Sequence, residues 1–180
     1  LWGTAMTLHA LAANEAQQDR GEAVVRHLEA SIALREQIGD VRGVAISQTL
    51  MAHWLAHQGD LRRAQALHQL SVRGYREIGD LSSMAHALAT VGGIARSLGD
   101  LPGAHAALRS ALTRFRTLGE RAEEAEMLHQ LGQVALAMGD DSRAGTLLEE
   151  SLSLARALGR QDVADAIRAD LAQMEQVLTS

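Results

Sequence analysis

Glycine recurs every 20 residues along most of this chain, and this spacing constrains the fold more than any other feature. The seven glycines are Gly39, Gly59, Gly79, Gly99, Gly119, Gly139 and Gly159. An acidic residue follows each of them except the last, which Arg160 follows. Glycine readily adopts the left-handed conformation that ends an α-helix. An acidic side chain accepts hydrogen bonds from the free N–H groups that start the next helix. The spacing therefore predicts a series of helices joined by short turns.

Each 20-residue step leaves roughly 16 residues for a helix, a length of about 24 Å. No part of the chain shows the alternation of apolar and polar residues that is typical of a strand. Pro102 fits the pattern because it falls in the first turn of a helix, where its missing N–H costs little. We expect nine helices, at residues 3–18, 22–38, 42–58, 62–78, 82–98, 102–118, 122–138, 142–158 and 161–178.

The true repeat is 40 residues long, because alternate helices carry different residues. In the first helix of each pair (the A helix), small residues form the columns Ala5, Ala45, Ala85, Ala125 and Ala12, Ala52, Gly92, Gly132, the second preceded by Leu11, Met51, Val91 and Leu131. In the second (the B helix), the columns are Val24, Ala64, Ala104, Ala144 and Ser31, Ser71, Ala111, Ser151, followed by Ile32, Val72, Leu112 and Leu152. Small residues let two helices approach closely, and the large residues fill the layer between them. One helix pair cannot bury both of its faces, so the pairs must stack.

The composition argues against several classes of protein. The chain has no Cys, which excludes a disulfide, a Cys-based zinc site and a thiol nucleophile. Its 17 basic residues are all Arg, and its net charge of −5 gives no electrostatic reason to bind nucleic acid. No apolar run reaches the roughly 18 residues of a membrane span. The sequence starts at Leu1 rather than Met, so we expect a fragment of a larger protein. We expect that protein to be located in the cytoplasm.

The columns resemble the tetratricopeptide repeat (TPR), whose helix pair carries a Leu-Gly in helix A, a Gly-Asp turn, and Ala positions in helix B. The pattern is carried by LHQLGQVALAMGDDSRAGTLLEESLSLA at residues 128–155, and LATVGGIARSLGDLPGAHAALRSAL at 88–112 is similar. The resemblance implies an all-α fold, a right-handed superhelical array of antiparallel helix pairs (a TPR-like α-solenoid). It also implies a single repeat domain over 1–180, with repeats at about 3–38, 42–78, 82–118 and 122–158 and a C-terminal capping helix at 161–178.

The chain departs from the TPR pattern in three ways. Its repeat is 40 residues rather than 34, so its helices should be longer. The aromatic positions of the family are filled by other residues, among them Leu55, Ala95 and Ala135. The first repeat carries Asp19-Arg20 where Gly-Asp is expected.

The last helix has the pattern of a cap, with one apolar stripe and one polar face. The stripe consists of Val163, Ile167, Leu171 and Met174, and we expect Asp162, Asp165, Arg168 and Glu175 to face water.

Repeats that are long, poor in aromatic residues and rich in Arg and Ala look like the arrays of large bacterial regulators, the STAND-class signalling ATPases and the LuxR-family transcriptional regulators. In such proteins the array is a sensor or docking module beside an ATPase or DNA-binding domain. This chain has no phosphate-binding loop and no helix-turn-helix pattern of its own. We therefore expect a non-catalytic scaffold that binds a protein or a peptide segment, as part of a bacterial regulator acting in signal transduction. The alternatives are a structural or oligomerising spacer, and a small-molecule or metal-sensing array.

In the resembled family the A helices build the inner wall of the array, where a partner binds. The matching positions here are Met6, His9, Ala13, Gln17, Ile46, Thr49, His53, His57, His86, Ala89, Gly93, Arg96, Glu126, His129, Gln133 and Leu136. This mixture of small, apolar and uncharged polar residues suits an extended peptide better than a highly charged ligand. Trp54, next to His53, is expected to report occupancy of the groove by its fluorescence.

Other chemistry has weaker support in the sequence. His53 and His57 have the spacing of two metal ligands, with His86 or His129 as a third, but we expect ordinary polar groove residues and no metal or other cofactor. No nucleophile with a base and an oxyanion hole is evident, Ser83 and His86 included, so the chain is not expected to be an enzyme. Glu123, Glu124 and Glu126 are interpreted as a solvated helix start. Solvated surface is also the expectation for the arginines of the second and third B helices, Arg62, Arg63, Arg73, Arg76, Arg109, Arg114 and Arg116. The pattern predicts no direct contact with nucleic acid or membrane and is compatible with self-association.

Overall fold

The computed structural model describes residues 1–18 and 21–178, except for the side chains of residues 175, 177 and 178. Over these residues the chain forms nine α-helices and no strand. The helices are α1 Trp2–Gln17, α2 Gly21–Gln37, α3 Val41–His57, α4 Leu61–Glu77, α5 Leu81–Ser97, α6 Leu101–Leu118, α7 Arg121–Ala137, α8 Asp141–Ala157 and α9 Gln161–Leu178. Every observed boundary lies within one residue of the predicted one. Asp19-Arg20, at which the first repeat departs from the Gly-Asp pattern, lies outside the described residues, as does the side chain of Glu175.

The repeated Gly-Asp pair ends one helix and starts the next, as predicted. All seven glycines have positive φ, from 69° at Gly159 to 84° at Gly59. At Gly99-Asp100, for example, Gly99 N donates to Arg96 O and Asp100 N donates to Ala95 O, which closes the helix with a reversed turn. The Asp100 side chain then accepts from Gly103 N at 2.9 Å.

Glu120 is the exception among the acidic residues that follow a glycine. It stands at the N-cap of α7, but its side chain makes no capping hydrogen bond. The side chain of Glu has one more methylene than that of Asp. Its carboxylate therefore does not fit the short hydrogen-bonded ring by which an Asp at the N-cap accepts from an N–H of the first turn. The prediction of a side-chain cap was therefore wrong at this residue.

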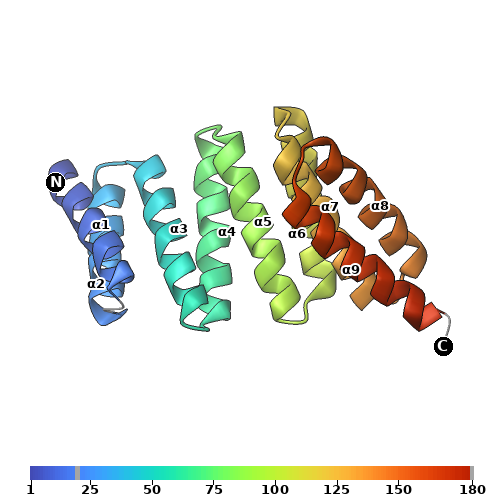
Figure 1. Cartoon of the computed structure of the whole chain (residues 1–180). Helices are drawn as coiled ribbons and strands as arrows, with labels where there is room; N and C mark the ends of the chain where they lie inside the picture. Colours follow the sequence, from blue (N-terminus) through green and yellow to red (C-terminus); the bar gives the residue numbers. More distant parts are fainter. Residues whose placement is uncertain (19–20, 179–180) are drawn as a thin grey trace. The chain divides into compact units, whose positions relative to one another are not determined.

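The chain divides into two compact units, an N-terminal unit at Leu1–Thr90 and a C-terminal unit at Val91–Ser180, with the division inside α5. In the N-terminal unit, α1 to α4 follow one another side by side in alternating directions (Figure 1), and α1 also contacts α3. Val72 and Tyr75 of α4 pack against Met84 and Ala87 at the start of α5, with Ala45 of α3 in the same cluster. Successive A helices are therefore neighbours in space, in addition to the two helices of each pair.

In the C-terminal unit, α6 to α9 pack in the same consecutive way, and α7 also contacts α9. Ile167 of α9 is fully buried with Leu148 and Leu152 of α8, and Val163 and Leu171 lie against the same cluster. The apolar stripe predicted for the last helix thus covers α8. Asp162 and Asp165 are exposed, and Arg168 pairs with Asp165.

The small-residue columns lie where the helices approach most closely. The four residues of the first column, Ala5, Ala45, Ala85 and Ala125, are at most 3% exposed. At the second column, a Cβ added to Gly92 would lie 2.6 Å from Leu108 Cγ, and one added to Gly132 would lie 2.7 Å from Leu148 Cδ2. These two glycines are therefore required by packing rather than by backbone conformation.

Leu11 is an exception to the predicted column of large buried residues. Its side chain is 43% exposed, whereas Met51, Val91 and Leu131 are buried. Within the described residues no helix covers this side of α1 in the way that α2 covers α3. None of the described helices is long and apolar enough to cross a bilayer.

Candidate functional site

Four of the groove residues expected from the sequence line one hollow in the N-terminal unit. The hollow has a volume of about 460 Å³ and lies between α3, α4 and the start of α5. We call it the imidazole hollow, and its lining consists of Thr49, His53, His68, Tyr75, Ser83, His86, Ala87, Ala89 and Thr90. Three of these nine residues are histidines, and none is an acid or an arginine. Its polar groups are therefore imidazoles and hydroxyls.

His68 forms the floor of the imidazole hollow and was missed among the groove residues. It lies on α4, and its side chain is fully buried. Neither ring nitrogen has a hydrogen-bond partner among the described residues. The equivalent residues of the other repeats, 40 residues apart, are Leu28, Leu108 and Leu148, all of them fully buried. That column of three leucines and one histidine was readable in the sequence and is the signal that could have found it.

Burial, with a smaller contribution from the nearby His53, lowers the pKa of His68 from 6.5 to about 4. The two rings lie with their centroids 4.9 Å apart and their planes inclined by 57°. Burial also lowers the pKa of His53, although this side chain remains partly open to solvent. At neutral pH both imidazoles are therefore uncharged, and each offers one N–H donor and one acceptor nitrogen.

The hydroxyl groups of the wall are oriented by the backbone of α3. Thr49 Oγ1 donates its single proton to Ala45 O at 2.9 Å. The Tyr75 hydroxyl, 3.3 Å from Thr49 Oγ1, must then be the donor in that contact. Tyr75 thus turns an oxygen lone pair, rather than a proton, to the remaining space.

A second hollow, of about 300 Å³, lies in the C-terminal unit and contains four more of the expected residues. These are Arg96, Glu126, His129 and Gln133, and the rest of the lining is Gln130, Asp162, Val163 and Ala166. His129 Nε2 donates to Asp170 Oδ2 at 2.7 Å, and Gln133 Nε2 donates to the same oxygen at 2.9 Å. Here the chain itself supplies a carboxylate, from α9, to two donors on α7.

The remaining expected residues do not line these two hollows. Met6 and Ile46 are 45% and 40% exposed, and Gln17 is exposed. His9 contacts Ser47 Oγ through Nδ1 at 3.1 Å, and its pKa is lowered by burial and by Arg35. The exposed His57 stacks against Trp54, with ring centroids 6.3 Å apart.

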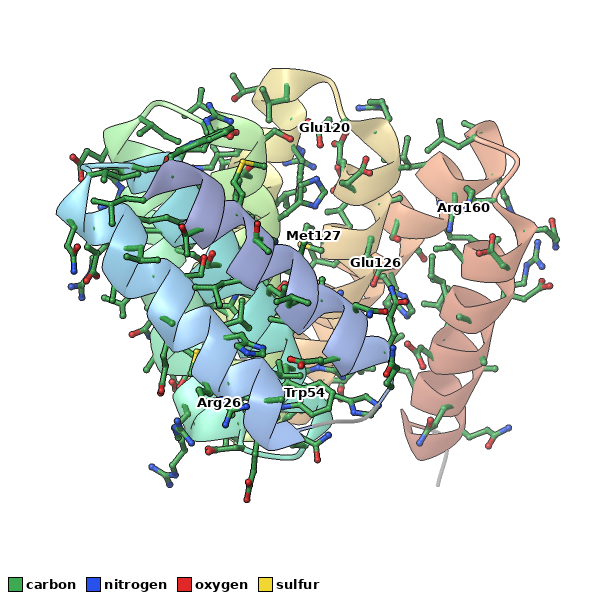
Figure 2. The ribbon with its side chains drawn as sticks, turned by 90° about the vertical axis from the view of Figure 1, so that its left-hand side faces the viewer. Arg26, Trp54, Glu120, Glu126, Met127 and Arg160 are labelled. Atoms are coloured by element: carbon green, nitrogen blue, oxygen red, sulfur yellow. The ribbon has the colours of Figure 1, made fainter. Side chains whose placement is uncertain are left out.

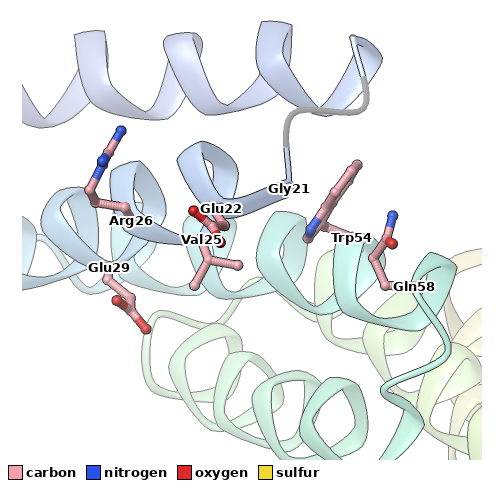
Figure 3. Close-up of a pocket in the computed structure, with 7 residues that line it drawn as sticks. All are labelled: Gly21, Glu22, Val25, Arg26, Glu29, Trp54 and Gln58. Carbon is pink, nitrogen blue, oxygen red and sulfur yellow. The ribbon is translucent and has the colours of Figure 1, made fainter.

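Trp54 does not face the imidazole hollow, so the expectation that its fluorescence reports the groove was wrong. It is 7% exposed and points toward Gly21 at the start of α2, where a Cβ added to this glycine would lie 3.3 Å from Trp54 Cζ2; Figure 2 labels Trp54 near this end of α2. It lines a different hollow of about 540 Å³ with Gly21, Glu22, Val25, Arg26, Glu29 and Gln58 (Figure 3). Neighbouring residues of a helix point about 100° apart, which is enough to separate Trp54 from His53.

Glu124 is not part of a solvated helix start. It is 4% exposed and accepts from Arg116 Nε at 2.8 Å and from Arg121 at 2.7 Å. Arg116 also donates to Glu150 at 2.5 Å. The two guanidinium groups offset the loss of water around the buried carboxylate, so this cluster is a structural ion-pair network.

A metal centre finds no support in the geometry. Among the residues that the structure describes, no group of three or more His, Asp or Glu side chains is placed to hold a metal ion. His53 pairs with His68 instead of forming a ligand set with His57, and His129 belongs to the C-terminal unit and binds Asp170.

Comparisons with known proteins place the fold among TPR-like repeat proteins. A comparison with protein-family models found no match, and a comparison with curated proteins found none either. Among solved structures, a signal-transduction ATPase of the STAND class with a tetratricopeptide repeat sensor, from Pyrococcus horikoshii, is similar with a TM-score of 0.84 and 16% identity over 92% of this chain. This chain spans only 26% of the length of that protein.

Two further solved structures have the same architecture. A putative kinesin light chain with nearly identical TPR-like repeats, from Podosopora anserina, gives a TM-score of 0.68 and 16% identity, over 94% of each chain. BtubC from P. vanneervenii gives 0.59 and 18%, over 99% of this chain and 91% of that one. At these identities the likeness shows the fold, an all-α TPR-like solenoid.

Proposed function

We propose that this chain is a non-catalytic scaffold that binds a peptide segment of a partner protein along the exposed faces of its A helices. The observation that carries the proposal is the imidazole hollow. It is open between two A helices and lined by residues expected to bind a partner protein. Its floor is a buried polar side chain that has no hydrogen-bond partner among the described residues. Hydroxyl and imidazole groups at such a place suit a peptide, which offers both donors and acceptors.

A sensor or docking module of a larger regulator is the setting that we propose for this scaffold. It is supported by the likeness to the STAND-class protein with a TPR sensor, which extends over 92% of this chain. In such a protein, binding at the repeats would bias the equilibrium of a neighbouring domain. A structural spacer, the other candidate from the sequence, would need no open polar hollow.

A selection from a random-peptide display library against the whole chain tests the proposal. The affinities of the selected peptides are then measured by calorimetry for a groove variant, His53→Ala with His86→Ala. The matched control is Arg73→Ala with Arg76→Ala, two exposed residues on α4. We expect the groove variant to weaken binding at least about tenfold and the control to leave it unchanged. A library without binders, or binders lost only in the control variant, contradicts the proposed function.

A further inference from the structure

The buried histidine of the imidazole hollow differs from the other histidines whose contacts the structure defines. His27 Nδ1 lies 2.7 Å from Glu15, His129 Nε2 lies 2.7 Å from Asp170, and Arg143 donates to His105 Nε2 at 2.8 Å. His68 is fully buried, yet both of its nitrogens lack a partner among the described residues. A buried polar group without a hydrogen bond is unfavourable because it has lost its contact with water and gained no partner, so a hydrogen bond to this imidazole would be stabilising.

The C-terminal unit shows what such a partner looks like at the equivalent place in the repeat. Shifting the sequence by two repeats matches Thr90 to Asp170, and Thr49 and His53 to His129 and Gln133. In the C-terminal unit a carboxylate oxygen accepts from both of those matched donors. In the N-terminal unit the matched residue, Thr90, has a hydroxyl in place of the carboxylate. This hydroxyl donates to His86 O at 3.1 Å.

The floor of the hollow changes together with its wall. Where His68 lies in the N-terminal unit, the C-terminal unit has the apolar Leu148. Compared with the C-terminal unit, the imidazole hollow has lost the internal carboxylate, and the donor missing at Thr49, whose proton goes to Ala45 O, is replaced by the imidazole of His68. Two imidazole donors, on His53 and His68, are thus left for a carboxylate that is supplied from outside.

We propose that the imidazole hollow binds the carboxylate of an Asp or Glu side chain of a bound peptide, held by N–H groups of His53 and His68. The lining contains no acidic residue that would repel this group. A cationic side chain would find no counter-ion there, and a metal ion would find no third ligand. The proposal rests on the proposed function, since the carboxylate arrives on a peptide.

Access to His68 depends on His53. The ring of His53 lies next to that of His68, and its side chain is partly exposed. Exposed side chains change rotamer on the picosecond to nanosecond timescale, so His53 can turn aside and then close on the entering carboxylate. His53 therefore acts as both cover and donor.

Binding of a carboxylate is coupled to proton uptake. The titratable groups that line the hollow together with His68 are His53 from α3, Tyr75 from α4 and His86 from α5. Burial and, to a smaller extent, His53 lower the pKa of His68 to about 4. A carboxylate beside the ring raises that pKa again because it stabilises the imidazolium. The affinity for an acidic peptide should therefore increase as the pH falls from about 7.5 to about 5.5.

The test compares the blocked tripeptides acetyl-Leu-Glu-Leu-amide and acetyl-Leu-Gln-Leu-amide on the whole chain. We expect the Glu peptide to bind about tenfold more tightly than the Gln peptide at pH 6. Imidazole ¹⁵N shifts followed by NMR should move toward imidazolium values for His68 with the Glu peptide only. In His68→Leu, which restores the leucine of the other repeats, the preference for Glu should disappear. The second variant is His53→Ala, which introduces the alanine that the first repeat has at the matching position, Ala13. The matched control is His105→Leu, which should retain the preference for the Glu peptide.

Equal binding of the two peptides, or a preference for Glu that survives in His68→Leu, overturns the carboxylate site. Library peptides that bind in the groove but show no acidic preference overturn the site and leave the proposed function intact. A chain that binds neither the tripeptides nor any library peptide overturns both.

Discussion

The imidazole rings of His53 and His68 lie with their centroids 4.9 Å apart, and the ring of His68 is buried with no hydrogen-bond partner in the part of the chain that the structure describes. A proton on either ring therefore lies close to the other ring, and the ring of His68 is closed off from water. Both rings have a lowered pKa, through burial in each case and through the neighbouring His53 for His68. A change at this pair of histidines should therefore affect both the stability of the N-terminal unit and the binding of a ligand in the imidazole hollow.

Replacing His68 with Leu should stabilise the chain by about 1–3 kcal/mol at pH 7, because it removes an unpaired buried polar group and restores a repeated leucine. Urea unfolding followed by circular dichroism gives the free energy of unfolding. His57→Leu, at an exposed position, is the control and should change it by less than about 0.5 kcal/mol. A loss of stability in His68→Leu would show that the imidazole already has a partner.

The same variant should be less sensitive to acid than the unmodified chain. The pKa of His68 is about 4 in the folded state and 6.5 in the unfolded state, so between these values the unfolded chain binds a proton that the folded chain does not. Stability must therefore fall as the pH falls from about 6.5 to about 4, by up to roughly 3 kcal/mol. A melting temperature measured across this range should show a shallower slope for His68→Leu. Parallel slopes for the two proteins would refute the assignment.

Two adjacent glycines of α5 should respond to alanine in opposite ways. A Cβ on Gly92 would meet Leu108 at 2.6 Å, whereas a Cβ on Gly93 would have no atom within 4 Å. Gly92→Ala should therefore cost about 1–3 kcal/mol through overpacking. Gly93→Ala should gain about 0.5–1 kcal/mol from helix propensity. Thermal unfolding of the two variants checks the helix phase directly, and changes of the same sign would contradict the packing described above.

Loss of an arginine from the ion-pair network around Glu124 should lower the free energy of unfolding more than loss of an ordinary surface arginine. Arg116→Ala leaves the buried Glu124 with Arg121 as its remaining defined partner, and should cost about 1–2 kcal/mol. Arg114→Ala removes only a bond to Ser110 O within its own helix, and should stay within about 0.5 kcal/mol. Chemical denaturation of both variants makes the comparison. Equal losses would mean that Glu124 is satisfied without Arg116.

The last helix should be essential for the stability of the C-terminal unit. Ile167 is fully buried against α8, so Ile167→Ala should cost about 2–4 kcal/mol. Asp165→Ala, on the exposed face of the same helix, is the control. Removal of residues 161–180 should expose Leu152 and its neighbours and cause aggregation or a lower melting temperature. Unchanged melting and solubility after this truncation would contradict the role of a cap.

The helix boundaries were predictable because the signals that set them are local. A glycine with positive φ and the acidic residue after it act within one turn of the chain, so Gly99 and Asp100 could be interpreted without knowing any neighbour. The packing columns were predictable for a similar reason, since the 40-residue period repeats the same environment.

The candidate site was only half predictable, because it depends on which helices meet. His53 and His86 were expected in the groove, but the burial of His68 follows from the packing of α4 on α3 and α5. The contact of His129 with Asp170 joins residues 41 positions apart on α7 and α9, and nothing near either residue in the sequence marks it. From the sequence, Glu124 is one of three acids at a helix start that are expected to be solvated. Its burial depends on Arg116 of the preceding helix, which lies beside it in the fold.

The local closure of each turn has a consequence for how the chain folds and evolves. Ser31 and Ser151, which hold the same place in different repeats, donate to Ala5 O and Ala125 O, in each case 26 residues away. Contacts of such short sequence separation allow folding to begin in any repeat and to spread to its neighbours, and they favour rapid folding. Because the turns after the seven repeated glycine positions are closed by hydrogen bonds between residues close in sequence, a 40-residue segment can be duplicated or deleted while the remaining repeats keep their register.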